Sequence, residues 1–169
     1  MIKIKVSNLT NGRYDFDFEG KASDLDIPEP YIGNFKTNIV LDKFDNQIIL
    51  DTETGIPANF ICDRCAKEFQ FVVKSEFKLV YLFRSSFDDS ENEKEDVVYL
   101  HPENDKIDLD KDIRDYAILA LPMKKLCSED CKGLCLKCGK NLNDGPCNCN
   151  EEIIDPRWEP ILKLKTKNN

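Results

Sequence analysis

A chain of 169 residues that is 41% hydrophobic is long enough for one ordinary domain and a small additional segment. Its opening residues alternate apolar and basic side chains, which disfavours a signal peptide. No stretch approaches the roughly 18 apolar residues that a membrane helix needs. We therefore expect a cytoplasmic protein whose thiols stay reduced, so that clustered cysteines indicate metal rather than disulfides.

The net charge of −8 is unevenly distributed along the chain. Residues 1–121 carry 15 Lys and Arg against 25 Asp and Glu, a balance of −10, whereas residues 122–169 carry 9 against 7, a balance of +2. An acidic body argues against a conventional, strongly basic nucleic-acid binder. The mildly basic C-terminal segment still permits contact with RNA.

Alternation of apolar and polar residues dominates the chain up to about residue 83. Pro28 and Pro30 predict a connector rather than a central strand. Apolar runs on both sides of Asp45 and Asn46 predict a hairpin. The predicted strands are residues 14–18, 39–41, 48–50 and 60–61, followed by one long strand or two within 69–83. These strands predict an antiparallel, partly closed β-sheet or barrel.

One helix is predicted, from Ile107 to Leu121, and Pro122 should end it. Three aspartates in its first turn support a helix start here, because negative charge is stabilised at the electropositive N-terminus of a helix. Before it, residues 85–96 are polar and acidic and predict a solvated loop, and residues 97–100 can return as a short strand. The apolar face of the helix has a spacing of three to four residues and consists of Leu109, Ile113, Tyr116, Ala117 and Ala120.

The predicted architecture is therefore an α+β fold with two parts. Residues 1–121 form an antiparallel β-rich domain that ends in the helix and carries the acidic loop. Residues 122–169 form a cysteine-rich, metal-binding tail, for which we expect a zinc knuckle.

Six of the eight cysteines lie in this tail, and the other two form a Cys-x-x-Cys at Cys62 and Cys65. Thiolates two residues apart on a tight turn supply two ligands of a tetrahedral zinc ion. Strand patterns flank the first pair, which predicts a knuckle at the tip of a hairpin. Cys135 and Cys138 predict a second knuckle, with Gly139 able to take the positive φ that such turns require.

Eight thiols are enough for two sites of four cysteines each. The second site is the more secure, because its loops are short and their closure costs little entropy. The first site needs the helix to bring the tail back to the hairpin, where the metal would staple it. The preferred partition is Cys62, Cys65, Cys127 and Cys131 in the first site, and Cys135, Cys138, Cys147 and Cys149 in the second.

Four other uses of clustered cysteines are alternatives to structural zinc. Disulfides are disfavoured without an export signal. A thioredoxin-like pair should begin a helix, whereas strands flank Cys62 and Cys65. An iron–sulfur cluster also takes four thiolates, so the spacing leaves it open. A catalytic zinc is disfavoured because four thiolates leave no position for water. We expect one or two zinc ions.

No residue pattern in the sequence indicates an enzyme. There is no Ser/His/Asp set, no phosphate-binding glycine loop and no carboxylate pair whose spacing requires catalysis. The only histidine, His101, precedes Pro102 and is predicted to lie at the surface. We expect a non-catalytic protein with no small-molecule substrate.

An ordered series of motifs resembles the YceD family, bacterial and plastid proteins implicated in the accumulation of 23S ribosomal RNA. The series spans most of the chain. Leu136 stands where relatives often carry proline, and some members of the family lack the later cysteines. The motifs are Cys62-x-x-Cys65, Leu121-Pro122, Leu126-Cys127, the run from Cys131 through Cys135-x-x-Cys138-Gly139 to Asn143, Cys147-x-Cys149, and Asp155-Pro156-Arg157-Trp158.

The resemblance implies a role in the biogenesis of the large ribosomal subunit, with ribosomal RNA or a pre-ribosomal particle as partner. Phosphate contacts need clustered Lys or Arg, which the tail supplies. The alternative is that these lysines keep the tail soluble and that the tryptophan anchors packing instead of stacking on a base. The candidate nucleic-acid-binding residues are Arg64, Lys124, Lys125, Lys132, Lys137, Lys140, Arg157 and Trp158.

Two further hypotheses remain open. The acidic body can dock a basic partner, such as a ribosomal protein, without touching RNA, because opposite charge speeds encounter. A thiol or metal enzyme ranks last, and a depressed thiol pKa at Cys62 or Cys65 in metal-free protein would favour it.

Overall fold

A computed structural model describes residues 2–83, 97–101 and 103–149 of the chain. These residues form two compact units. The larger contains Met1–Asp63 and Lys67–Cys127, and the smaller contains Arg64–Ala66 and the described part of Ser128–Asn169.

The larger unit is built on a five-stranded sheet with the strand order β2-β3-β4-β5-β6. Its strands are β2 (Gly12–Lys21), β3 (Asn34–Phe44), β4 (Gln47–Ile61), β5 (Glu68–Phe83) and β6 (Val97–Leu100). The prediction of a mainly β protein with one helix is confirmed. The first four strands are antiparallel, but β6 runs parallel to β5, with Val80 opposite Val97 and Phe83 opposite Leu100. The sheet is therefore mixed and open, and the predicted partial closure is not found among the described residues.

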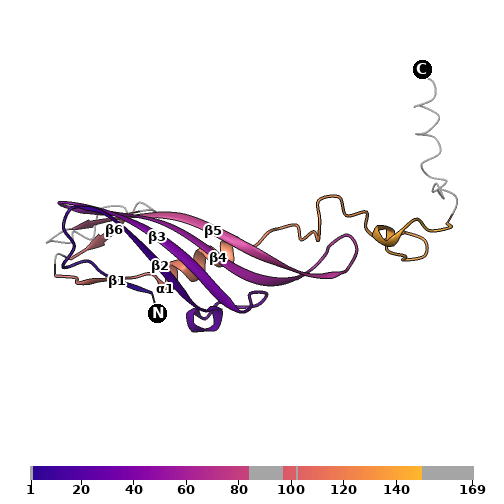
Figure 1. Ribbon diagram of the computed structural model, residues 1–169, viewed down its shortest axis with the longest axis horizontal. Helices are drawn as coiled ribbons and strands as arrows, with labels where there is room; N and C mark the ends of the chain where they lie inside the picture. Colours follow the sequence, from indigo (N-terminus) through magenta and orange to yellow (C-terminus); the bar gives the residue numbers. More distant parts are fainter. Residues whose placement is uncertain (1, 84–96, 102, 150–169) are drawn as a thin grey trace, which may run out of the picture. The chain divides into compact units, whose positions relative to one another are not determined.

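Long hairpins make up most of this sheet. The predicted hairpin at residues 45–46 is confirmed, since Phe44 pairs with Gln47 across a two-residue turn. β4 and β5 pair from Gln47 to Ile61, whereas β3 leaves β4 at Gly55. The far end of the β4–β5 hairpin therefore extends beyond β3, as Figure 1 shows. Residues 69–83 belong to one strand rather than two.

The core lies on the face of the sheet that α1 (Asp110–Leu119) covers (Figure 1). Every second side chain of β4 points into it, from Ile48 to Phe60, and each is buried. Ile113 and Ala117 are the buried residues of α1, and the Tyr116 ring stacks on Phe77 with centroids 4.2 Å apart. Alternation in the strands and helical spacing in α1 thus bury one face of each element.

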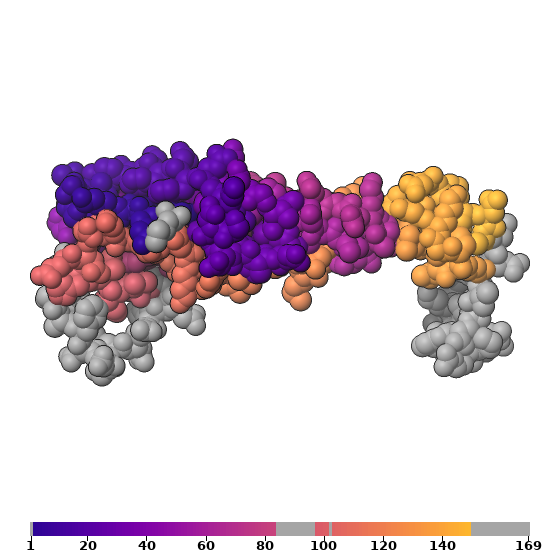
Figure 2. All heavy atoms as spheres, turned by 90° about the horizontal axis from the view of Figure 1, so that it is seen from below, coloured from indigo at the N-terminus to yellow at the C-terminus, as the bar shows by residue number. Residues whose placement is uncertain are grey.

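The helix begins three residues later than predicted, because Ile107 belongs to a strand. β7 (Lys106–Asp108) pairs with β1 (Lys3–Lys5), and this pairing sets buried Ile107 opposite buried Ile4. Figure 2 shows the salmon residues of this part of the chain against the indigo N-terminal residues. None of the described helices is both long enough and apolar enough to cross a bilayer.

The opposite face of the sheet is polar and exposed along the edge strand β2. Along β2, the aromatic side chains facing the core are half-buried, whereas Asp15, Asp17 and Glu19 on the other face are exposed. Among the described residues, β3 is the only strand that pairs with β2, so β2 is an edge of the sheet. η1 (Ala22–Leu25) follows β2 and contributes Ala22 and Leu25 to the core.

The smaller unit has almost no apolar interior. Its one described helix is the three-residue η2 (Leu142–Asp144), which buries no side chain. Among its described residues only Cys65, Cys131 and Gly133 are buried. Hydrophobic burial therefore contributes little to this unit, and two of its three buried residues are cysteines.

Candidate metal centres

The sulfur atoms of the eight cysteines gather in two groups of four. Within each group, all sulfur atoms lie within 4.8 Å of one another. All eight thiols are free of disulfides. The first group is Cys62, Cys65, Cys127 and Cys131, and the second group is Cys135, Cys138, Cys147 and Cys149.

In the larger unit, the turn after β4 positions Cys62 and its partner Cys127. The Cys62 N–H donates to the Lys67 carbonyl oxygen at 2.9 Å, which closes the turn between β4 and β5. Asp63 makes a reciprocal contact with Lys125. Its N–H donates to the Lys125 carbonyl at 2.8 Å, and its Oδ2 accepts from the Lys125 N–H at 2.7 Å. Since Lys125 is two residues before Cys127, this pair holds the chain beyond α1 against the first knuckle.

In the smaller unit, Arg64 positions Cys131 through both its side chain and its backbone. The guanidinium Nη1 donates to the carbonyl oxygens of Glu129 at 3.0 Å and Cys131 at 2.9 Å. The Arg64 carbonyl accepts from the Leu134 N–H at 3.2 Å. Gly133, at φ +75°, lies so close that an added Cβ would be 3.0 Å from that carbonyl oxygen. Only glycine satisfies both the left-handed backbone and this close approach.

The second group is built on a tight turn at Cys135. The Gly139 N–H donates to the Cys135 carbonyl at 2.9 Å, and Gly139 has the positive φ that the sequence predicted, +72°. The backbone N–H groups of Cys138 and then Lys137, followed by the Cys147 thiol at 3.4 Å, lower the pKa of the Cys135 thiol to about 6.

The close approach of the thiols in this group opposes ionisation of the Cys149 thiol. Its neighbour Cys138, followed by desolvation, raises the pKa of Cys149 to about 12. Thiolates this close repel one another unless a cation lies between them. A bound divalent ion reverses this preference, because a coordinating thiol is deprotonated outright.

Both groups suit a tetrahedral, thiophilic ion. Thiolates bind zinc at about 2.3 Å, which places tetrahedral sulfur atoms about 3.8 Å apart. The sulfur atoms of each group lie within 4.8 Å of one another, close enough for four thiolates to share one ion. The environments differ. In the first group Cys62, Cys65 and Cys131 are at most 5% exposed, whereas Cys138 and Cys149 of the second group are exposed.

The structure assigns local contacts to several of the predicted nucleic-acid-binding residues. The Lys125 ammonium lies 5.7 Å from the centroid of the Phe60 ring, and the Lys140 Nζ donates to the Pro146 carbonyl at 2.9 Å. Lys124, Lys132 and Lys137 are exposed. Arg157 and Trp158 lie outside the described residues, as does the predicted acidic loop at 85–96.

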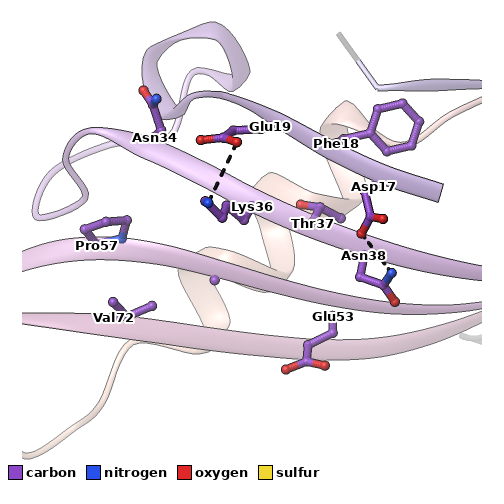
Figure 3. Close-up of a pocket in the computed structure, with 11 residues that line it drawn as sticks. Asp17, Phe18, Glu19, Asn34, Lys36, Thr37, Asn38, Glu53, Pro57 and Val72 are labelled. Atoms are coloured by element: carbon purple, nitrogen blue, oxygen red, sulfur yellow. Dashed lines mark hydrogen bonds and ion pairs between the residues drawn. The ribbon is translucent and has the colours of Figure 1, made fainter.

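The outer face of the sheet carries a second feature of interest, a shallow groove of about 760 Å³ (Figure 3). It runs across β2, β3 and β4, and its charged lining residues are mainly acidic. Lys36 lies 3.8 Å from Glu19, and the Asn38 amide donates to Asp17 at 3.0 Å. Glu53 lines the groove as well.

Sequence reasoning did not identify two residues that organise these centres. Asp63 forms hydrogen bonds with the backbone of Lys125. The sequence shows only an acidic residue inside a Cys-x-x-Cys and does not indicate this contact. The Asn143 amide donates to the Cys131 sulfur at 3.3 Å. Asn143 belongs to the cysteine-rich motif, but its spacing from Cys131 does not predict this contact.

Comparison with known proteins places the chain in a family. The model of the family "Large ribosomal RNA subunit accumulation protein YceD" matches residues 50–165. The chain is 41% identical over 71 residues, 42% of its length, to the "Large ribosomal RNA subunit accumulation protein YCED homolog 1, chloroplastic" of Arabidopsis thaliana. It is 32% identical over 103 residues, 61% of its length, to an uncharacterised protein of Mycobacterium tuberculosis.

These matches span 22% of the plant protein and 48% of the mycobacterial protein, so the chain matches half or less of each relative. No solved structure matches it. The family model covers well over half of the chain and includes both cysteine groups. The chain therefore belongs to the YceD family.

Proposed function

We propose that this protein is a non-catalytic, zinc-stabilised factor in the biogenesis of the large ribosomal subunit, where it supports accumulation of 23S ribosomal RNA. The observation that carries the proposal is the family match, which spans residues 50–165. The matched plant relative is named for accumulation of the large ribosomal RNA subunit. The structure adds two groups of four cysteine thiols that could each hold a metal ion.

The zinc ion in each group would have a structural role. Four thiolates close the coordination sphere, leaving no position for substrate. In the smaller unit, metal binding replaces the missing apolar core, because binding free energy becomes folding free energy when the unfolded chain has no preformed site. We expect two zinc ions for each chain, which elemental analysis with thiol titration tests. An iron–sulfur cluster would instead give iron, acid-labile sulfide and visible absorbance.

We propose that exposed lysines beside the cysteine groups contact ribosomal RNA or a pre-ribosomal particle. Each phosphate contact releases counterions, so the contribution of a lysine is visible in the salt dependence of binding. Trp158 and Arg157 are further candidates for this contact, as is Arg64. The guanidinium bonds of Arg64 to backbone carbonyls also give it a structural role.

A matched pair of variants tests the RNA contact. One variant changes Lys124, Lys125, Lys132, Lys137 and Lys140 to glutamine. The control changes five exposed lysines of the larger unit to glutamine, Lys5, Lys21, Lys36, Lys74 and Lys111, and so alters the net charge equally. We expect only the first variant to lose affinity for 23S fragments and to show a smaller salt slope, with zinc content unchanged. Equal losses in both variants would reject a specific contact by these lysines.

The acidic groove on the outer sheet face favours a second candidate function, the docking of a basic protein. Asp17, Glu19 and Glu53 line it, against Lys36 alone. A basic ribosomal protein would complement this surface, and the interaction would survive nuclease treatment. Asp17→Lys with Glu53→Lys should abolish such a complex, and its persistence in that variant would exclude the groove.

A further inference from the structure

The side-chain amide of Asn143 has only one orientation that satisfies its neighbours. Its Oδ1 accepts a hydrogen bond from the Lys132 N–H at 2.8 Å. Its Nδ2 is 2.8 Å from Asn141 Oδ1 and 3.3 Å from the sulfur of Cys131. Since the amide oxygen is fixed by a backbone donor, the NH₂ group must face the sulfur. The Cys131 sulfur is therefore the acceptor, and a thiolate accepts more strongly than a thiol.

This donor belongs to the loop that the second cysteine group closes. Asn143 is in η2, between Cys138 and Cys147. The helix buries no side chain, and a 3₁₀ segment of three residues has little stability of its own. A hydrogen bond connects η2 to the turn at Gly133, because the Leu142 N–H donates to the Gly133 carbonyl oxygen at 2.9 Å. The Asn143 N–H also donates to Asn141 Oδ1 at 3.0 Å. Metal bound at the two ends of the loop would reinforce these hydrogen bonds and hold Asn143 in place more firmly.

We propose that Asn143 is a positioning residue that couples the two metal groups. An ion in the second group orders the loop, the ordered loop holds the Asn143 amide against Cys131, and the hydrogen bond stabilises the Cys131 thiolate that ligates the first ion. Thermodynamic linkage makes the effect reciprocal, so an ion in the first group also favours binding to the second. The inference rests on the proposed zinc binding and goes beyond it by assigning a coupling between the two centres and the residue that carries it.

Hydrogen-bonded partners of metal ligands typically contribute 10- to 100-fold to metal affinity. We expect Asn143→Ala to weaken zinc retention at the first group by about tenfold, the lower end of that range, because Asn143 is exposed. Asn143→Asp is the sharper variant. It keeps the volume and the acceptor for Lys132, and it replaces the donor facing the sulfur with an oxygen. Asn8→Asp is the control, with the same charge change in an exposed residue of the larger unit that is distant in sequence from every cysteine.

A thermodynamic cycle on the full chain tests the coupling. Zinc retention at the first group is measured by chelator competition under reducing conditions, with stoichiometry from native mass spectrometry. The chains are the wild type, Asn143→Ala, the double variant Cys147→Ser with Cys149→Ser, and the triple variant. We expect the single and double variants to lose similar affinity at the first group and the triple variant to lose no more. Additive losses, or no loss in Asn143→Ala, would overturn the proposal.

Cadmium NMR supplies a readout that general destabilisation would not produce. In the cadmium-loaded protein, Asn143→Asp should shift the resonance of the first group, and Asn8→Asp should leave that resonance in place. An unchanged first resonance in Asn143→Asp would overturn the proposed sulfur contact. A wild-type chain that binds no metal would reject the zinc function itself, whereas two ions binding independently would reject only the coupling.

Discussion

Replacing Arg64 with lysine separates two roles of this side chain. The guanidinium donates to the carbonyl oxygens of Glu129 and Cys131 at 3.0 Å and 2.9 Å. Lysine keeps the positive charge, but its ammonium is a point donor on a flexible stem and does not reproduce the planar guanidinium. We therefore expect Arg64→Lys to weaken zinc retention at the first cysteine group while preserving attraction to phosphate.

The expected loss of zinc affinity follows from the two hydrogen bonds of the Arg64 guanidinium. A bond from a charged donor contributes about 1.5–3 kcal/mol. Arg64 is exposed, so solvent screening reduces the pair to about 1–2 kcal/mol together. Since 1.4 kcal/mol corresponds to a factor of ten, the zinc affinity of the first group should fall by about 5- to 30-fold.

The assay is competition for zinc with a chromophoric chelator under reducing conditions. Lys67→Ala is the control, because Lys67 is a neighbouring exposed cation on the same turn that contributes only its backbone carbonyl to the described hydrogen bonds. It should retain zinc as the wild type does. Wild-type zinc affinity in Arg64→Lys, together with a salt slope for RNA binding lower by about one in Arg64→Ala, would refute the reasoning. Those two results together would indicate that Arg64 contacts phosphate rather than positioning Cys131.

Other perturbations address the cysteine groups and the core. A chelator should remove the ion of the second group before that of the first, because the second group is more exposed, and metal release should show two phases. Gly139→Ala should destabilise the zinc-loaded protein by about 1 kcal/mol through its left-handed backbone. Gly133→Ala should destabilise it further, since its Cβ would also lie 3.0 Å from a carbonyl oxygen, and the reverse order in thermal unfolding would contradict this. Thr52→Val should raise the free energy of unfolding by about 1 kcal/mol, because its buried hydroxyl has no partner among the described residues. Thr54→Val should lower it in the same urea titrations, because its hydroxyl is 2.9 Å from that of a threonine on β3. Burial raises the pKa of Tyr31 from 10.0 to about 12, so its contribution to stability is complete below pH 10 and is lost as the pH rises through 12. Tyr31→Phe removes a hydroxyl that donates to a carbonyl of α1, so it should lower stability at pH 7 and flatten the alkaline loss.

Local patterns predicted the parts of the fold that local contacts stabilise. Apolar runs around residues 45–46 placed the β3–β4 hairpin correctly, because alternation and a short turn fix its register. The start of α1 was placed too early because Ile107 pairs with Ile4, more than a hundred residues away. The parallel direction of β6 depends likewise on pairing with β5, which no property of residues 97–100 specifies.

The same difference between local features and long-range contacts applies to the cysteine groups. Spacing identified the Cys-x-x-Cys pairs, since two thiolates on one tight turn are a local feature. The contacts that bring distant segments together were not predictable from spacing. Asp63 reaches Lys125 across 62 residues of sequence, and Asn143 reaches Cys131 through an amide whose orientation depends on a third segment. Such contacts depend on the folded path of the chain rather than on periodicity.

The acidic row on β2 bears on how this protein avoids aggregating. An edge strand of ten residues exposes backbone groups that can template further strands. Two copies meeting edge to edge would bring Asp15, Asp17 and Glu19 against their equivalents, and facing like charges are destabilising. The row therefore disfavours edge-to-edge pairing of two copies at neutral pH. It also makes the same edge selective, because an extended segment with Lys or Arg at every second position would meet no such repulsion.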